Sequence, residues 1–414
     1  MSKTVIIGGG IIGLSIAWEL HKRGENVLVL DARTAGTAAS AANAGYMVMT
    51  HTGPVPTPGL VRTSLKWMLN PESPLYIKPR LSPAFLSWLY RFWRACNSTA
   101  YEAGAEATML LRGDLPALLQ EWVDDGIDFE LHKAGRIHAY NIQSSMESDL
   151  SGWEGTEYHQ PQPLYGDDLR HFEPALSDEI VAGFHIEEDY AVQPNSLVNG
   201  LIAKLRSAGV EVRQGSPVVD LEVSQKRIVA VRTPSERIPA DHVVIAAGAW
   251  SGAISKMAGV RLPIEGGKGY GLDYKSVTEK PKRAISLKNH QIAVSPFDEG
   301  LRLGGTMELS GISDAMAPRR IAAIERGGKR SLRGLPEDAK PDHIWTGMRP
   351  MAPDGLPVMG RLRGFNNLSV ASGHSMLGVT LAPATAKLMA DFVITGYEPE
   401  LMKSFSPDRF KGRI

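Results

Sequence analysis

A glycine-rich turn between an apolar run and a helical pattern is the feature that most constrains the fold of this chain. Residues 4–7 are apolar and lead directly into GGGIIG at residues 8–13, after which the spacing of apolar residues predicts a helix. A second apolar run, residues 27–30, ends at Asp31. A G-x-G-x-x-G motif between a strand and a helix, with an acid about 20 residues on, is typical of a Rossmann-type dinucleotide-binding unit.

Each part of this motif has a physical role in holding a dinucleotide. Gly8 permits a tight turn, Gly10 lacks a Cβ and so lets the backbone approach a pyrophosphate, and Gly13 lets the helix pack close to the sheet. The helix N-terminus offers unpaired N–H groups to phosphate oxygens. Asp31 can accept hydrogen bonds from both ribose hydroxyls of an adenosine, and it would repel a 2′-phosphate.

The composition excludes several classes of protein. The chain has 414 residues, enough for two domains, and its 45 basic residues equal its 45 acidic ones, whereas a nucleic-acid-binding protein shows a basic excess. Its one cysteine, Cys96, excludes a disulfide framework, and we expect no metal site. Because no apolar run is long enough to span a membrane and residues 1–3 lead straight into the first strand, we expect a cytoplasmic protein without a signal peptide.

Two further segments repeat the pattern of a strand followed by a glycine. They are residues 241–250 and 368–374, and helical patterns cover residues 197–208 and 381–394. Short strands are predicted at residues 211–213, 218–223 and 228–231. If the three strand–glycine segments share one sheet, other segments are inserted between its strands. We therefore predict a discontinuous nucleotide-binding domain made of residues 1–126, 187–262 and 344–414.

The inserted segments have the pattern of an antiparallel sheet. Residues 129–140 and 263–303 contain short β-like runs, and residues 317–333 have the pattern of a basic helix with a solvated face. Antiparallel strands with helices on one face form an α+β domain. We predict that residues 127–186 and 263–343 form such a substrate-binding domain, which makes the fold class α/β plus α+β.

With these motifs in order, the chain resembles the D-amino acid oxidase/dehydrogenase superfamily of flavoproteins. Within it, the chain is similar to bacterial D-amino acid dehydrogenases and their proline-oxidising relatives. The resemblance covers nearly the whole chain. It rests on residues 8–13 with Asp31, then 37–45, 66–69, 245–250, 345–350 with 353–357, and 373–383.

The resemblance implies a glutathione-reductase-like domain that binds FAD non-covalently. Independently, residues 40–45 are small, as a backbone lying against an isoalloxazine ring requires, although an ordinary loop has the same composition. Residues 266–269 lack a β-α-β context, so the electron acceptor is expected to be quinone or dioxygen rather than nicotinamide. The residues implied for cofactor binding are Gly8, Gly10, Ile12, Gly13, Asp31, Ala32, Ser40, Asn43, Ala44, Gly45, Val218, Ala247, Gly248, Trp250, Gly347, Gly373, Gly378, Val379 and Thr380.

Three residues are candidates for catalysis. By resemblance, Arg349 binds the substrate carboxylate through its planar fork; the alternative is a structural arginine paired with an interdomain acid. Tyr270 would donate a second hydrogen bond to that carboxylate, or it is a core aromatic. His374 would bond the flavin or orient the substrate, or it is a buried structural histidine. Lys268 is a weaker candidate, since an exposed lysine is the simpler interpretation.

Other positions bear on the substrate and on attachment. Met376 stands where the glycine-oxidase branch of the superfamily has an arginine, which favours an apolar pocket. Tyr46 and His51 are low-ranked candidates to face the flavin. Cys96 lies in an apolar helix, so covalent flavin attachment is not expected. The face of residues 82–94 formed by Phe85 and its neighbours at helical spacing could contact a membrane, although burial between domains is the favoured interpretation.

The sequence as a whole therefore predicts an FAD enzyme that oxidises a D-amino acid or a cyclic D-imino acid of the D-proline or hydroxyproline type. An N-methyl amino acid oxidase is an alternative within the class. A flavin-binding subunit without its own activity, and an NAD-dependent dehydrogenase, are alternatives outside it. The sequence leaves the oligomeric state open.

Overall fold

The strand that precedes the glycine turn lies inside a largely parallel sheet. The computed structural model describes residues 3–50, 53–60, 75–153 and 160–410. Within them, the first sheet has the order β10 (Glu211–Arg213), β2 (Asn26–Leu30), β1 (Lys3–Ile7), β14 (His242–Ile245), β21 (Leu368–Ser372) and β20 (Val358–Arg361). All neighbours are parallel except β20, which is antiparallel to β21. The three strand–glycine segments therefore share one sheet, as predicted.

Both faces of this first sheet are covered. On one face pack α1 (Ile11–Lys22), α8 (Pro194–Ser207) and α11 (Gly378–Thr395). On the other face lie η1 (Gly248–Trp250), α9 (Ser251–Met257) and a small antiparallel sheet of β11 (Asp220–Ser224), β12 (Arg227–Arg232) and β13 (Arg237–Pro239). Strands that are buried on both faces read as continuous apolar runs, which explains why the sequence predicts β1, β2 and β14.

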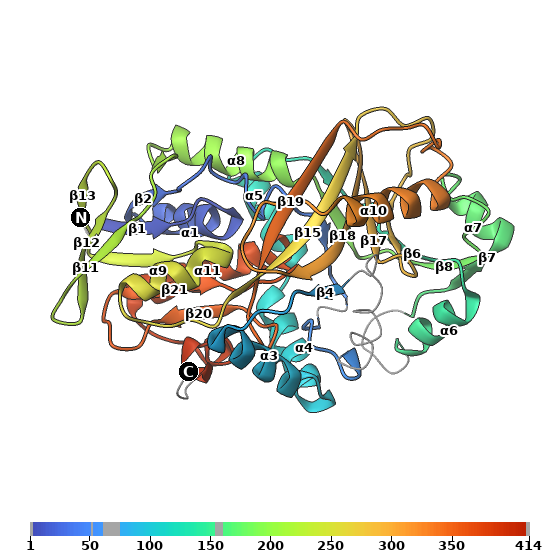
Figure 1. Ribbon diagram of the computed structural model, residues 1–414. Helices are drawn as coiled ribbons and strands as arrows, with labels where there is room; N and C mark the ends of the chain where they lie inside the picture. Colours follow the sequence, from blue (N-terminus) through green and yellow to red (C-terminus); the bar gives the residue numbers. More distant parts are fainter. Residues whose placement is uncertain (1–2, 51–52, 61–74, 154–159, 411–414) are drawn as a thin grey trace.

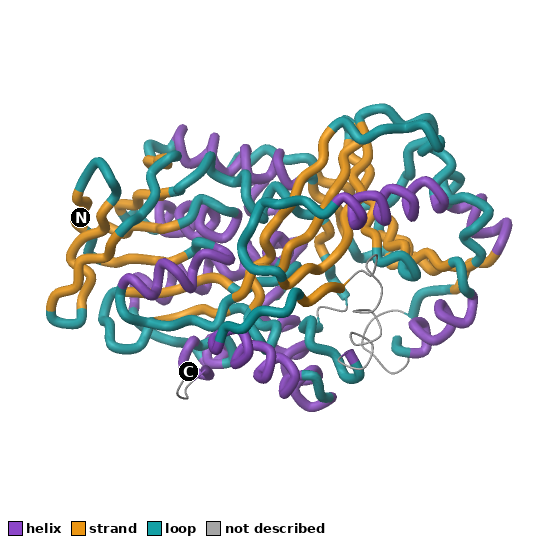
Figure 2. Tube along the Cα trace, viewed as in Figure 1, coloured by secondary structure: helices purple, strands orange, loops and turns teal. Residues whose placement is uncertain are grey.

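The second large sheet is mostly antiparallel. Its order is β19 (His343–Met351), β15 (Glu265–Tyr274), β18 (Gly300–Leu309), β17 (Ile292–Phe297), β16 (Ala284–Leu287), β6 (Arg136–Tyr140), β8 (Ala182–Ile186) and β7 (Pro163–Tyr165), and β4 (Leu75–Ile77) pairs with β18. Figures 1 and 2 show the first sheet beside the N-terminus and the second sheet toward the opposite end of the molecule. The predicted class, a Rossmann-type domain combined with a sheet-based substrate domain, is confirmed.

Sheet membership differs from the predicted domain limits at two places. β19 pairs with β15 from His343 to Met351, so these residues belong to the second sheet, although the prediction places residue 344 onward in the nucleotide-binding domain. β4 likewise pairs with β18 from within residues 1–126. The sequence of β19 resembles any strand, and only its hydrogen-bond partner decides which sheet it joins.

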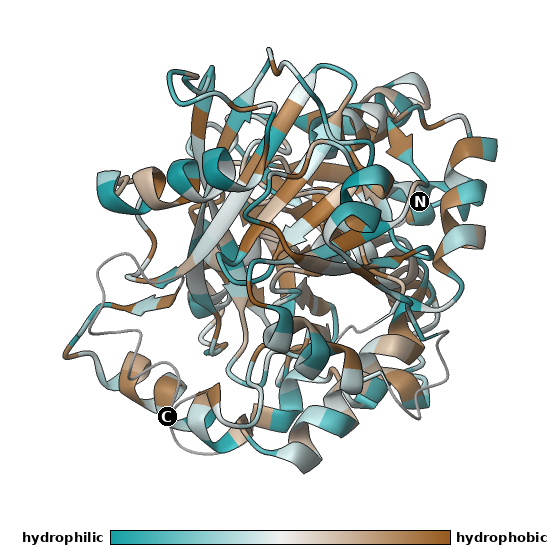
Figure 3. Ribbon diagram, turned by 90° about the vertical axis from the view of Figure 1, so that its right-hand side faces the viewer, coloured by the Kyte–Doolittle hydropathy of each residue, from teal (hydrophilic) through white to brown (hydrophobic). Residues whose placement is uncertain are grey.

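The remaining elements connect and cover the two sheets. A small sheet of β3 (Tyr46–Met47), β9 (Tyr190–Val192) and β5 (Leu131–His132) lies in the connecting segments. Figure 3 shows hydrophobic residues along strands in the middle of the molecule and hydrophilic residues on outer turns and loops. The helices not yet named are α3 (Pro83–Ala95), α4 (Ser98–Arg112), α5 (Leu115–Asp124), α6 (Gln143–Ser151), α7 (Gly166–Phe172), α10 (Pro318–Ser331), α12 (Glu400–Lys403) and η2 (Pro407–Phe410).

Helix α3 buries the apolar face formed by Phe85 and its neighbours at helical spacing. Phe85, Trp88 and Phe92 pack against Leu309 and Met351, so the favoured interpretation, burial, holds for this face. The opposite side of the same region exposes Leu81, Leu86, Tyr90 and Trp93. No helix among the described residues combines the length and the hydropathy needed to cross a bilayer.

Helix α10 is not solvated along its whole basic face. Arg319, Arg326, Arg330 and Arg333 are exposed, as predicted. Arg320 is buried, and its Nε lies 3.0 Å from Glu308 Oε2. The prediction was wrong for Arg320 because this residue lies one helical turn before buried Ile324, on the side that packs against the second sheet.

Candidate active site

The glycine turn opens onto a cavity at the carboxyl ends of β1, β2 and β14. Gly8 has φ +118°, and a Cβ there would lie 2.3 Å from the carbonyl oxygen of Ala246. A Cβ on Gly13 would lie 2.0 Å from the carbonyl oxygen of Gly8. On Gly10 it would approach only Ser40 Oγ, at 3.1 Å. Gly8 and Gly13 are therefore required by packing, whereas Gly10 leaves its backbone open to the cavity.

Asp31 orders the turn as well as lining the cavity. Its carboxylate accepts hydrogen bonds from the backbone N–H groups of Gly9, at 2.7 Å, and Arg33, at 2.8 Å. Desolvation by burial raises the pKa of Asp31, and these two bonds oppose that rise. A carboxylate offers about four acceptor positions, so Asp31 keeps the capacity to bind ribose hydroxyls.

Most of the predicted cofactor residues line this one cavity. Those that do are Gly8, Gly10, Ile12, Asp31, Ala32, Ser40, Asn43, Val218, Ala247, Gly248, Trp250, Gly378 and Val379. Two of the others have packing contacts, since a Cβ on Gly347 would meet Ala42 and a Cβ on Gly373 would meet Val358. Those that do not line it are Gly13, Ala44, Gly45, Gly347, Gly373 and Thr380.

Several residues that line the cavity were not predicted from the sequence. Arg33 lines the cavity, and its guanidinium lies 4.8 Å from the ring of Trp250. Ser216 and Pro217 line it just before Val218. The position of Arg33 shortly after Asp31 could have suggested it, but residues 216–217 precede a strand of the small sheet and carry no motif.

Arg349 lies next to the cavity on β19, between the lining residues Met348 and Pro350. Its Nη1 donates a hydrogen bond of 2.7 Å to the carbonyl oxygen of Thr306. Its guanidinium lies over Gly269, where a Cβ would come within 2.5 Å of Nη2. Desolvation alone lowers the pKa of Arg349 to about 10, and no carboxylate among the described residues pairs with it. The structural alternative, a partner acid from the other domain, is therefore absent from the described part of the chain.

The backbone that receives the Arg349 hydrogen bond has an unusual conformation. Thr306 has φ +66°, and the register between β15 and β18 shifts beside it, between Lys268 and Tyr270. A β-branched residue in the left-handed region is uncommon and is found where the surroundings impose it. The bulge turns the carbonyl group of Thr306 to the guanidinium of Arg349.

Tyr270 does not lie with Arg349. Its ring is 1% exposed and packs in the core of the second sheet with Leu272 and Ile324 of α10. Its hydroxyl donates a 2.8 Å hydrogen bond to Glu308 Oε2. Since side chains alternate along a strand, Tyr270 and the guanidinium over Gly269 lie on opposite faces of β15. The structure thus supports the core interpretation of Tyr270.

Lys268 shares that buried environment rather than being exposed. Its Nζ donates to the carbonyl oxygen of Ala315 at 2.8 Å and lies 3.7 Å from Glu308 Oε1. It lies two residues from Tyr270, on the same face of β15. The prediction of an exposed lysine was wrong, because Lys268 pairs with Glu308 of β18 and its side chain lies on the face of the sheet that α10 covers.

His374 lines the cavity and is almost fully buried. Its Nε2 lies 3.1 Å from Thr385 Oγ1, and its Nδ1 has no partner among the described residues. Desolvation lowers the pKa of His374 to about 3, so the imidazole is neutral near pH 7.

The lower-ranked candidates lie elsewhere. Tyr46 donates through its hydroxyl to the carbonyl oxygen of Ile285 and does not line the cavity. Met376 is 49% exposed, and it also does not line the cavity. Cys96 donates through Sγ to the carbonyl oxygen of Phe92 at the end of α3. His51 and residues 66–69 lie outside the described part of the chain.

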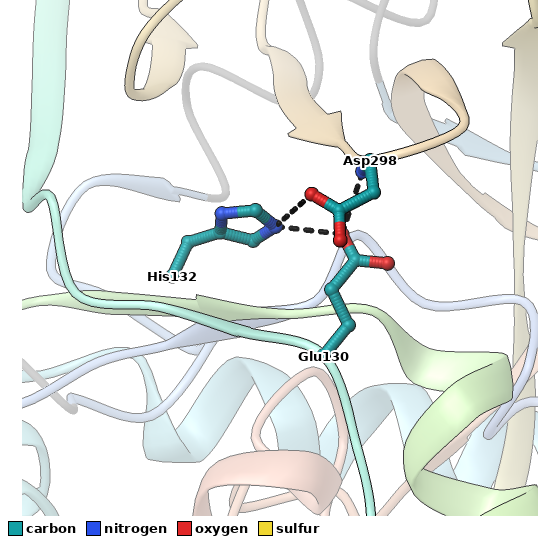
Figure 4. Close-up of side chains that lie close together, drawn as sticks. All are labelled: Glu130, His132 and Asp298. Atoms are coloured by element: carbon teal, nitrogen blue, oxygen red, sulfur yellow. Dashed lines mark hydrogen bonds and ion pairs between the residues drawn. The ribbon is translucent and has the colours of Figure 1, made fainter.

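A separate group of side chains of types that can bind a metal does not line the cavity. Glu130, His132 and Asp298 bring one ligand atom each within 4.8 Å of one another (Figure 4). His132 Nε2 lies 2.6 Å from Glu130 Oε1, which also accepts a hydrogen bond from the backbone N–H of Asp298. These hydrogen bonds account for the arrangement without an ion.

Comparisons with known proteins match this architecture. The chain matches the DAO family, described as FAD dependent oxidoreductase, over residues 3–392. It is 31% identical over 413 residues to a D-amino acid dehydrogenase of Rhizobium johnstonii, with 96% of this chain and 97% of the relative covered. A D-amino acid dehydrogenase of Vibrio cholerae serotype O1 is 29% identical over 412 residues, with 96% of each covered.

Solved structures share the fold at lower sequence identity. Glycine oxidase from Bacillus cereus ATCC 14579 has a TM-score of 0.76 and 21% identity, covering 100% of this chain and 99% of its own. L-proline dehydrogenase from P. horikoshii has a TM-score of 0.72 and 19% identity, covering 99% of this chain and 97% of its own.

The cavity residues suit FAD, the cofactor of this family. Gly10 leaves room for phosphate oxygens at the N-terminus of α1, and Asp31 offers acceptors beside it. Gly378 and Val379, which also line the cavity, begin α11, and because the first N–H groups of a helix have no intrahelical partner they can donate to an acceptor on the ligand. These donors and acceptors therefore suit the phosphates and the ribose of a dinucleotide, with further donors for its ring system.

Proposed function

Because this chain belongs to the DAO family of FAD-dependent oxidoreductases, we propose that it oxidises a D-amino acid, or a cyclic D-imino acid of the D-proline or hydroxyproline type. When bound, FAD accepts a hydride from the substrate Cα. The product is an imine, which water converts to a 2-oxo acid, or a cyclic pyrroline. The relatives named D-amino acid dehydrogenase, at 31% and 29% identity over nearly the whole chain, support this choice.

The observation that carries the proposal is the guanidinium of Arg349, which has no paired acid among the described residues and lies on a strand whose residues Met348 and Pro350 line the cofactor cavity. A buried cation without an acid is costly unless an anion binds to it. One of its nitrogens is held by the carbonyl of Thr306, which leaves the rest of the fork for a ligand. A substrate carboxylate matches that fork with two hydrogen bonds.

His374 is the second residue in the proposed site. Its neutral ring lines the cavity, and its Nδ1 lacks a protein partner among the described residues. We assign it to a hydrogen bond with the cofactor or the substrate amine. Tyr270 is not included, since its hydroxyl already bonds Glu308.

An N-methyl amino acid oxidase is the second candidate. The fold shared with glycine oxidase favours it, but that likeness, at 21% identity, concerns the fold alone. Met376 stands at the position of an arginine in the glycine-oxidase branch, but its side chain is exposed and does not line the cavity, so it does not decide between the two candidates.

For the electron acceptor we propose quinone or dioxygen, and for the location the cytoplasm, with peripheral contact to the inner membrane face. The exposed side chains of Leu86, Tyr90 and Trp93 on α3, with Arg94 beside them, support such contact. Sedimentation with anionic vesicles tests it: we expect the double variant L86S/W93S to bind less than the wild type. Equal binding by both proteins would reject this surface.

Anaerobic mixing with a panel of amino acids tests the proposed reaction. We expect D-amino acids or D-proline to bleach the bound flavin and L-amino acids to leave it yellow. Bleaching by sarcosine but not by D-amino acids would favour the second candidate. No bleaching by any amino acid would overturn the proposal.

A further inference from the structure

Arg302 joins the second sheet to the segment that borders the cofactor cavity. It lies on β18, is 4% exposed, and its Nε and Nη2 form a two-pronged ion pair with Asp273, at 2.8 and 3.0 Å. Its Nη1 donates to the backbone carbonyls of Ala41, at 2.9 Å, and Asn43, at 2.8 Å. One side chain therefore holds two carbonyl groups of the 41–44 segment against the sheet.

Neighbouring strands complete this attachment. Asp273 and Ser295 lie directly opposite Arg302 on β15 and β17. Ser295 Oγ donates a 2.5 Å hydrogen bond to the carbonyl of Ala44, and Trp345 Nε1 donates to Asp273 Oδ1 at 3.1 Å. Three carbonyls of the 41–44 segment thus accept hydrogen bonds from side chains of one sheet.

The 41–44 segment touches both halves of the proposed site. Asn43 lines the cofactor cavity. Ala42 packs on Gly347, two residues before Arg349 on β19, so that a Cβ on Gly347 would lie 2.7 Å from Ala42 Cβ. The position of this segment therefore links the place of the cofactor to the place of the substrate arginine.

We propose that Arg302 is a positioning residue that sets the 41–44 segment against the second sheet, and thereby the cofactor relative to Arg349. The proposal rests on the function proposed above. The guanidinium is required because it binds Asp273 with two nitrogens and the backbone with the third. A lysine keeps the charge but cannot make these four hydrogen bonds.

The test compares Arg302→Lys, Arg302→Met and Ser295→Ala with the control Arg330→Met. Arg330 is 63% exposed and pairs with Glu179 on the surface, so its replacement removes a charge without touching the segment. Three quantities are measured: the Kd of FAD for apoprotein by fluorescence titration, the visible spectrum of bound flavin, and the anaerobic reduction rate of FAD-saturated protein at several concentrations of a D-amino acid.

We expect both Arg302 variants to bind FAD at least about tenfold more weakly, which is about 1.4 kcal/mol. The bound flavin should show a shifted spectrum. The limiting reduction rate should fall about 10- to 100-fold, because small misplacement of reacting groups has effects of this size. The half-saturating substrate concentration should change little, since Arg349 is intact. Ser295→Ala should act in the same direction but less, and Arg330→Met should match the wild type.

Two results would overturn the proposal. The first is wild-type FAD affinity, spectrum and reduction rate in Arg302→Lys. The second is a lower unfolding temperature with all three quantities unchanged, which would make Arg302 a purely structural residue. If Arg302→Met does not fold, Arg302→Lys and Ser295→Ala still decide the matter. If no amino acid reduces even the wild type, the proposed function fails, while FAD affinity and spectrum still test Arg302.

Discussion

At the scale of single residues, burial decides the chemistry of Arg349. Its guanidinium has no paired acid among the described residues, and desolvation lowers its pKa to about 10. We predict that Arg349→Ala lowers kcat/KM for the acid substrate, with a loss of transition-state stabilisation of about 2–5 kcal/mol, because the bound carboxylate is left desolvated and unpaired. Arg349→Lys should also lose activity, since it loses the fork. FAD content should stay near the wild-type value.

The control for Arg349 is an amine substrate that lacks the carboxylate. Both Arg349 variants should lose the preference for the acid over this amine, measured as the ratio of the two kcat/KM values. A wild-type ratio in Arg349→Ala would show that another residue binds the carboxylate.

Two histidines, the buried His374 and the partly buried His242, make the free energy of unfolding depend on pH. Burial lowers the pKa of His374 to about 3 and that of His242 to about 4. Because the unfolded chain binds these protons near the ordinary pKa of about 6.5, acid favours unfolding. The stability is complete above about pH 6.5 and falls as the pH drops from there toward the folded pKa values, by roughly 1 kcal/mol per pH unit for each histidine.

Thermal unfolding of the FAD-loaded protein between pH 7.5 and pH 5 measures this dependence. We predict a falling unfolding temperature, and a smaller fall in His374→Asn and in His242→Asn. His242 does not line the cavity, so only His374→Asn should also change FAD affinity. Equal pH dependence in all three proteins would contradict the assignment to these histidines.

At the scale of helices and strands, the sequence predicts the elements better than their faces. The runs in β1, β2, β14 and β21 are recognisable because strands buried on both sides are continuously apolar. The face of β15 is not, because Lys268-Gly269-Tyr270-Gly271 contains glycine at alternate positions. This pattern does not tell which face of the strand carries the guanidinium of Arg349, and the structure places the Tyr270 hydroxyl on the opposite face, bonded to Glu308.

The glycines of β15 provide space that β19 uses. Trp345 lies over Gly271 and the guanidinium of Arg349 over Gly269, so a Cβ at either glycine would collide with the side chain above it. We predict that Gly269→Ala displaces Arg349, since the new Cβ would lie within 2.6 Å of three guanidinium atoms. The expected result is a rise in KM and a loss of about 10- to 100-fold in kcat/KM at normal FAD content.

Gly304→Ala on β18 is the matched control. A Cβ at Gly304 would meet its nearest atom only at 3.8 Å, so the same chemical change should leave the kinetics near the wild type. Equal effects of the two substitutions would indicate a general loss of strand flexibility rather than displacement of Arg349. No effect of Gly269→Ala would show that the guanidinium can move without loss of binding.

At the scale of the whole molecule, the cofactor cavity is lined by both large sheets. Gly8 and Asp31 come from the first sheet and its turns, whereas Met348 and Pro350 come from β19 of the second. The sequence predicts the first set, since it has a motif with a fixed spacing. It does not predict the second set, because Met348 and Pro350 lie about 300 residues beyond Asp31 in the chain. They reach the cavity only through the pairing of β19 with β15, a contact between segments distant in sequence.

A ligand that binds in a cavity lined by both sheets should stabilise the folded molecule by mass action. We predict that FAD is held without a covalent bond: acid precipitation should leave the yellow colour in the supernatant, since Cys96 does not line the cavity. Added FAD should then raise the unfolding temperature of apoprotein, with about 2.7 kcal/mol of stabilisation at a free concentration of 100 Kd. Asp31→Asn, which keeps the shape but loses the charge, should need more FAD for the same rise. Colour that stays with the precipitate would reject the non-covalent claim, and an unfolding temperature independent of FAD would show that the cavity at the glycine turn does not bind it.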